Sequence, residues 1–181
     1  MPSVLPSVLP KIALQEKANI TLVVSADMDG PAGAAALKFG RQIVRNGRAL
    51  LLNLERGDAD AGLGLSDLLS GKATFTDVIR RDDASRLHVI ELGQGAVMLG
   101  EAFDLIIEAL AQTYSFLIIN GGAAEGAVSD ALARTCDTAV ISASQAVRTG
   151  RLDMLRDRLR TAGAPEVVDM PIIDDETRQA A

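Results

Sequence analysis

The chain has 181 residues and a net charge of −6, which allows one domain with a sizeable core and argues against general affinity for nucleic acid. Its single cysteine, Cys136, excludes a disulfide framework and suits a reducing cytosol. Hydrophobic residues make up 48% of the chain and aromatic residues only 3%, so we expect a core of small aliphatic residues, as in buried parallel sheets.

The first ten residues, MPSVLPSVLP, repeat the unit SVLP, and their prolines forbid a regular helix or a central strand. We therefore predict an arm or linker at residues 1–18, one α/β domain at 19–172 and a polar tail at 173–181. Two interpretations of the arm stay open, a tether from an upstream segment and a surface arm.

The segment from Ile20 to Gly47 is an apolar run, a glycine-containing turn and an amphipathic run. This order predicts a strand, a loop and a helix, the frame in which P-loop proteins bind phosphate. A working loop surrounds phosphate with backbone N–H groups, adds a lysine, and holds Mg²⁺ with a Ser or Thr hydroxyl.

Six residues occupy the loop here: Asp29, Gly30, Pro31, Ala32, Gly33 and Ala34. Pro31 has no N–H, Ala32 has no charge, and neither Gly33 nor Ala34 offers an oxygen ligand. We therefore expect no cofactor and no metal at this degenerate loop. The alternative is an ordinary βα turn that never bound phosphate.

Two acids, Asp27 and Asp29, put negative charge where a phosphate would lie. Our hypothesis is that Asp29 or its neighbour caps the helix, with Pro31 in the first turn. A carboxylate of the protein itself would then occupy the place of the anion.

The pattern from Ala34 to Asn46 predicts an amphipathic helix. Its apolar face holds four residues: Ala36, Phe39, Gly40 and Ile43. Lys38, Arg41 and Arg45 lie on the other face and form a candidate interface for an acidic partner or anionic lipid, although a solvated face is the simpler interpretation.

Further strands are predicted at 49–54, 87–92, 115–120, 138–142 and 166–170, with helical segments at 64–71, 74–80, 101–113, 129–136 and 151–162. Strands that alternate with helices require crossover connections and hence a mainly parallel sheet covered on both faces. The polar turn with Asp58 and Asp60 lacks the calcium-loop spacing, and Gly93-Gln-Gly95 does not complete a dinucleotide motif. His88 has no partner visible in the sequence, so we interpret it as structural or exposed.

Several segments follow the order and spacing of one known family. Ser25-Ala26 opens the loop, and GLSDLLSG from Gly64, VIELG from Val89, YSFLIIN from Tyr114 and SDALARTCDTAVIS from Ser129 follow in turn. The chain thus resembles the deviant-Walker P-loop ATPases of the MinD/ParA group. It is most similar to the cytoplasmic kinase-like domain of bacterial tyrosine autokinases and polysaccharide co-polymerases, which govern capsular and exopolysaccharide chain length. The resemblance implies a three-layer P-loop NTPase-like fold.

The departures from that family fall on its functional positions. The loop lysine and hydroxyl residue become Ala32 and Gly33, and the Walker B aspartate becomes Asn120. The Asp-x-Asp that should end the second strand is replaced by Asn53 and Glu55 or, in the other register, by Leu54 and Arg56. The family's C-terminal tyrosine cluster is missing, since the only tyrosine precedes a strand, and no Glu-x-x-Arg-x-x-Arg helix is visible before the first strand.

The resemblance and these departures together imply a pseudo-ATPase or pseudokinase of exopolysaccharide chain-length control and export. It would lie at the cytoplasmic face of the inner membrane, contact protein partners or copies of itself, and bind no nucleic acid. One alternative is an active ATPase or tyrosine kinase that takes its positive charge from Lys72 or from a partner's arginine. Another is a MinD/ParA-like localisation or assembly factor.

Overall fold

The computed structural model describes residues 17–28, 32–56 and 62–172. Its strands are β1 Asn19–Ser25, β2 Ala49–Asn53, β3 Arg80–Arg81, β4 His88–Ile90, β5 Phe116–Ala123, β6 Thr138–Ala143 and β7 Val167–Pro171. Its helices are α1 Ala32–Ile43, α2 Leu65–Leu69, α3 Phe75–Val78, α4 Glu101–Ala111, α5 Ala127–Ala133 and α6 Thr149–Ala162. Most of the predicted arm, the polar tail, Asp29 to Pro31, and Asp58 with Asp60 lie outside the described residues.

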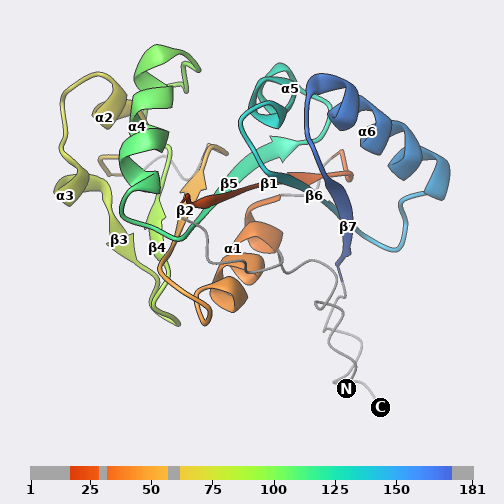
Figure 1. Cartoon of the computed structure of the whole chain (residues 1–181), viewed down its shortest axis with the longest axis horizontal. Helices are drawn as coiled ribbons and strands as arrows, with labels where there is room; N and C mark the ends of the chain where they lie inside the picture. Colours follow the sequence, from red (N-terminus) through yellow and green to blue (C-terminus); the bar gives the residue numbers. More distant parts are fainter. Residues whose placement is uncertain (1–16, 29–31, 57–61, 173–181) are drawn as a thin grey trace.

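The strands form one sheet in the order β3-β4-β2-β5-β1-β6-β7, and every neighbouring pair is parallel except β3 with β4. Helix α1 lies on one face of the sheet, while α2, α4, α5 and α6 lie on the other (Figure 1). The predicted α/β architecture of three layers around a mainly parallel sheet is thereby confirmed.

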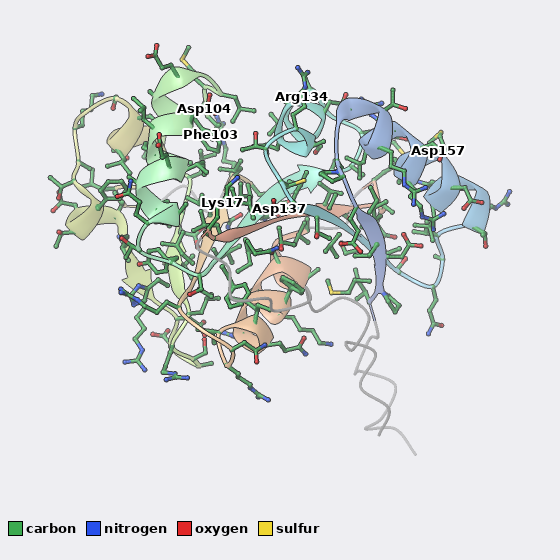
Figure 2. The ribbon with its side chains drawn as sticks, viewed as in Figure 1. Lys17, Phe103, Asp104, Arg134, Asp137 and Asp157 are labelled. Atoms are coloured by element: carbon green, nitrogen blue, oxygen red, sulfur yellow. The ribbon has the colours of Figure 1, made fainter. Side chains whose placement is uncertain are left out.

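Alternating side chains of the central strands pack into two separate cores. Leu22 and Val24 of β1 join the larger core, beneath α4, α5 and α6, whereas Val23 between them joins the smaller core beneath α1. Phe103, which Figure 2 labels on α4, is 2% exposed in the larger core, and Phe39 of α1 is 2% exposed in the smaller one. Both faces of the sheet are therefore buried, as its aliphatic composition predicts.

The predicted apolar face of α1 is correct, because Ala36, Phe39, Gly40 and Ile43 are all buried. Helix α1 itself begins at Ala32 and ends at Ile43, two residues before and three residues before the predicted limits of 34 and 46. Such shifts are ordinary for helix ends, where capping rather than periodicity decides the boundary.

Two strands differ from the sequence-based expectation. Strand β3 is a two-residue antiparallel edge strand, Arg80–Arg81, whereas Arg80 was predicted to be the last residue of a helical segment. Strand β5 extends through Gly121-Gly122 to Ala123, three residues beyond the predicted limit of 120. Its register with β1 shifts by one residue at this point, from Val23 opposite Asn120 to Val24 opposite Gly122.

Within the described residues, no helix is both long and apolar enough to cross a membrane. Cys136 is buried, and burial together with the nearby Asp137 carboxylate raises the pKa of its thiol to about 11. This thiol is therefore protonated and unreactive at neutral pH.

Candidate functional site

The candidate site lies where β2 and β5 end beside the N-terminus of α1. Asn53 of β2 pairs directly with Asn120 of β5, so the two amides lie side by side at the carboxyl edge of the sheet. Ligands of open α/β sheets bind at this edge. The first described residues of α1, Ala32 and Gly33, complete the site.

The carboxylate of Glu55 is bound at the N-terminus of α1. Its Oε2 accepts hydrogen bonds from Gly33 N at 2.9 Å and Asn120 Nδ2 at 2.8 Å, and its Oε1 accepts one from Ala32 N at 3.3 Å. Free N–H groups at a helix N-terminus attract anions, and here a side chain of the same chain supplies the anion. The sequence-based hypothesis named Asp29 or its neighbour as the carboxylate at this helix end, and the structure shows Glu55 there. Asp29 itself lies outside the described residues.

Asn120 links this carboxylate to a row of polar side chains. It is fully buried, and its Nδ2 also donates to Asn53 Oδ1 at 2.7 Å, while its Oδ1 accepts from Gly122 N at 3.1 Å. Asn53 in turn donates to Glu91 Oε2 at 2.7 Å. Both N–H groups of the Asn120 amide are therefore already used, and such a group is a poor anchor for Mg²⁺.

These contacts show which side chains at the end of β2 face the candidate site. Asn53 and Glu55 face the site, whereas Leu54 packs against the larger hydrophobic core. Of the two alternatives left open by the sequence, Asn53 and Glu55 are therefore the pair that lies at the site.

Two glycines fit closely around the Glu55 side chain. A Cβ atom at Gly33 would lie 3.1 Å from Glu55 Oε2 and 3.3 Å from Asn120 Nδ2. Gly122 has a φ of +75°, a conformation that favours glycine, and its Cβ position is 3.4 Å from Glu55 Cγ. A hydroxyl residue at position 33 would therefore require Glu55 to move.

The second acid near the loop, Asp27, has a different partner. Its carboxylate accepts from Ser144 N at 2.9 Å and from Ser144 Oγ at 2.6 Å. Arg151 of α6 donates to Ala26 O at 2.8 Å and to Glu125 at 3.0 Å. The end of β1 is thereby fastened to the segment between β6 and α6, and the Asp27 charge is directed toward Ser144.

The three residues of the predicted basic stripe differ in their contacts. Arg41 makes a bidentate ion pair with Asp82, at 3.0 and 2.7 Å, whereas Lys38 and Arg45 are exposed. Hydrogen bonding to Arg41, opposed by burial, lowers the pKa of Asp82 from 3.8 to about 2. Arg41 is thus an attachment point for the β3–β4 turn as well as a candidate interface residue.

The remaining positions singled out in the sequence have structural partners. His88 Nδ1 lies 2.6 Å from Tyr114 Oη, and Gly95 N donates to Ser66 Oγ at 3.0 Å. Lys72 is exposed beyond the end of α2, and its backbone N–H donates to Asp67 O. In the described ranges, no group of three or more His, Cys, Asp or Glu side chains is arranged to hold a metal.

A cavity of about 350 Å³ adjoins α1 on the side of β3 and β4. Its charged lining residues are Arg80, Arg81, Asp82, Asp83 and Glu91. Three carboxylates against two guanidinium groups make this cavity unfavourable for a triphosphate. Sequence reasoning did not predict it, because β3 brings both arginines there and β3 itself was not predicted.

Comparison with solved structures identifies the fold. The VpsO kinase domain is 15% identical, with a TM-score of 0.73 and coverage of 86% of each chain. The kinase domain of the Escherichia coli tyrosine kinase ETK is 19% identical, with a TM-score of 0.69 and coverage of 87% of this chain and 69% of that one. MinD in the Aquifex aeolicus MinC:MinD complex is similar at 13% identity, with a TM-score of 0.70 and coverage of 85% and 68%.

No family model and no curated protein sequence matches this chain. At these levels of identity the structural similarity establishes the fold alone, which this chain shares with the two kinase domains and with the MinC:MinD complex. The site residues then have to be interpreted from their own chemistry.

Proposed function

We propose that this chain is a non-catalytic P-loop-like module, a pseudo-ATPase or pseudokinase, of an exopolysaccharide synthesis and export system. The observation that carries the proposal is the Glu55 carboxylate on the N–H groups of Ala32 and Gly33. A nucleotide phosphate would need the same N–H groups and would meet the negative charge of Glu55 there.

The chemistry of the surrounding residues supports the same conclusion. Phosphoryl transfer depends on positioning and on neutralising the charge of the transferred group. Ala32 supplies no positive charge, Gly33 no hydroxyl, and Asn120 neither a carboxylate for Mg²⁺ nor a base. The loss of three separate parts of the site argues against turnover by an unconventional route.

The assignment to a polysaccharide system rests on the resemblance of the segments around Gly64, Val89 and Ser129, with support from the fold that the chain shares with bacterial tyrosine kinase domains. In this proposal the module works at the cytoplasmic face of the inner membrane through contacts with protein partners. Lys38 and Arg45, both exposed on α1 or just after it, are the candidate contact residues.

The test is thermal unfolding of the protein with and without ATP and Mg²⁺. A ligand at a hundred times its Kd stabilises a protein by about 2.7 kcal/mol, which is several degrees for a domain of this size. We expect no shift with millimolar nucleotide, and we expect Ala32→Lys to show none either, because Glu55 and Asn120 remain. A clear Mg²⁺-dependent shift in the wild-type protein would contradict the proposal.

A second candidate function is a MinD/ParA-like localisation or assembly factor. The similarity to MinD supports it, since MinD and the tyrosine kinase domains match this fold about equally well. Deleting the gene distinguishes the two functions. Altered exopolysaccharide chain length supports the first, and altered division or partition with normal polysaccharide supports the second.

A further inference from the structure

A second cavity, of about 370 Å³, lies at the edge of the sheet opposite Glu55, where β2, β4 and β5 begin. Nine residues line it: Val44, Arg45, Asn46, Gly47, Arg48, Ala49, Arg86, His88 and Tyr114. Its volume falls within the range of about 300–1,000 Å³ that is usual for small-molecule sites.

The cavity concentrates positive charge in a chain whose net charge is −6. Arg45, Arg48 and Arg86 contribute three guanidinium groups, and no carboxylate belongs to the lining. In the part of the chain that the structure describes, none of the three takes part in an ion pair. Figure 2 shows nitrogen-tipped side chains projecting from the lower edge of the molecule, below β3, β4 and α1.

These arginines come from two separate segments, because Arg45 and Arg48 share the connection between α1 and β2, whereas Arg86 lies in the turn between β3 and β4. Arg45 follows the C-terminus of α1, Arg48 precedes β2, and Arg86 precedes β4. A basic residue after a helix complements the negative end of the helix dipole, which accounts for Arg45 alone. Arg48 and Arg86 are not on a helix, so the dipole does not explain why they converge on the same cavity.

The floor of the cavity is held in place by contacts among three of its residues. Tyr114 is 5% exposed, and its hydroxyl lies 2.6 Å from His88 Nδ1. The guanidinium carbon of Arg48 lies 5.4 Å from the centroid of the Tyr114 ring, within the range of a cation–π contact. This contact restrains the Arg48 side chain before any ligand arrives, which lowers the entropy cost of binding.

We propose that this cavity binds a small oxyanion with two or more negative charges, either a phosphate ester or a polycarboxylate. Guanidinium groups present paired N–H donors that match the oxygens of both classes. The proposal does not depend on the absence of nucleotide binding, because Glu55 and the degenerate loop lie at the other edge of the sheet. Arg45 is the one residue that both proposals use.

The protein carries its own reporter of this site. Tyr114 is the only tyrosine, and the chain has no tryptophan, so the intrinsic fluorescence of the protein comes from the floor of the cavity. We expect pyrophosphate and citrate, each titrated in about 0.15 M chloride to screen weak surface binding, to give a saturable change in Tyr114 emission. An anion at the N-terminus of α1 would leave this signal unchanged.

Three variants of exposed arginines locate the binding. Arg48→Gln and Arg86→Gln each remove one charge from the cavity and should weaken binding about tenfold. The control Arg148→Gln removes the same charge next to α6, outside the cavity, and should bind like the wild type. Far-UV circular dichroism and the thermal midpoint verify that each variant is folded.

The titrations also distinguish the two classes of anion, phosphate esters and polycarboxylates. A response to pyrophosphate alone identifies phosphate esters, and a response to citrate alone identifies polycarboxylates. No saturable change with either anion, or an equal loss of affinity in Arg148→Gln, would overturn the proposal.

Discussion

At the scale of single residues, Glu55 defines the candidate site, because its carboxylate joins the N–H groups of α1 to the Asn120 amide. Hydrogen bonds to a charged acceptor are worth about 1.5–3 kcal/mol, more than those between neutral groups. We therefore expect Glu55→Gln, which keeps the shape but turns an acceptor into a donor, to lower the free energy of unfolding by about 2 kcal/mol.

Urea unfolding measures this loss, and Glu125→Gln is the matched control. Glu125 forms an ion pair with Arg151 near the surface, which we expect to contribute less than about 1 kcal/mol. Equal stability losses in the two variants would show that Glu55 is an ordinary surface acid.

The effects of substitutions at Asn120 and Glu55 on stability should be coupled. Asn120→Asp places a second carboxylate about where Nδ2 now donates to Glu55 at 2.8 Å, so we expect a loss of about 3 kcal/mol from repulsion in a buried position. Adding Glu55→Gln removes the repulsion and should recover much of that loss. A double-mutant cycle measures the coupling, and additive effects would contradict the contact.

The ion pair between Arg41 and Asp82 predicts a specific pH dependence. The folded protein lowers the pKa of Asp82 from 3.8 to about 2, so the stabilisation is complete above pH 4 and is lost as the pH falls toward 2. The difference in unfolding free energy between the wild type and Asp82→Asn should therefore be constant above pH 4. Below pH 4 this difference should become smaller as the pH falls. Urea titrations of both proteins at a series of pH values measure this difference in unfolding free energy.

The sequence predicted some of these residues and missed others for a physical reason. The presence of Ala32, Gly33 and Asn120 at the site could be predicted from the sequence, because the loop and the apolar strands follow one another in a recognisable order and spacing. The role of Glu55 could not, since its contact with Gly33 joins segments 22 residues apart and depends on the register of β2. The Arg41 pair was missed because β3 and its turn had no recognisable pattern.

At the scale of secondary-structure elements, long periodic segments were predictable and short edge elements were not. The period of α1 identified its buried face, and the apolar runs identified β1, β2, β5 and β6. Strand β3 consists of Arg80–Arg81, too short and too polar for any periodicity to appear. Its position is decided by pairing with β4, which is a tertiary contact.

The crossing of two backbones at Gly64 and Gly93 fixes α2 against the end of β4. A Cβ atom at Gly64 would collide with the backbone of Glu91 and Gly93, which cannot move aside as a side chain can. We expect Gly64→Ala to destabilise the protein by about 1–3 kcal/mol. The control is Gly150→Ala in α6, where nothing lies within 4 Å and the change should be neutral or stabilising.

Thermal or urea unfolding of both glycine variants gives the comparison. A Gly64→Ala protein as stable as the wild type would show that the backbones can separate without cost.

At the scale of the whole molecule, the two cores share the strands between them, so we expect the two cores to unfold together. Phe39→Ala empties space beneath α1 and Phe103→Ala does so beneath α4, and we expect each to cost about 3–5 kcal/mol. Both variants should still unfold in one transition. Tyr114 fluorescence and far-UV circular dichroism should give the same midpoint, and two separate midpoints would contradict shared cores.

The attachment of Glu55 to the main chain has a consequence for competition. A tethered group acts as a ligand at an effective concentration set by its short connection, and this concentration does not fall when the protein is diluted. Any free phosphate compound must therefore outcompete an internal inhibitor that is always present. The N-terminus of α1 would then not respond to the cellular concentration of ATP. A regulatory ligand or partner would have to bind another surface of this protein.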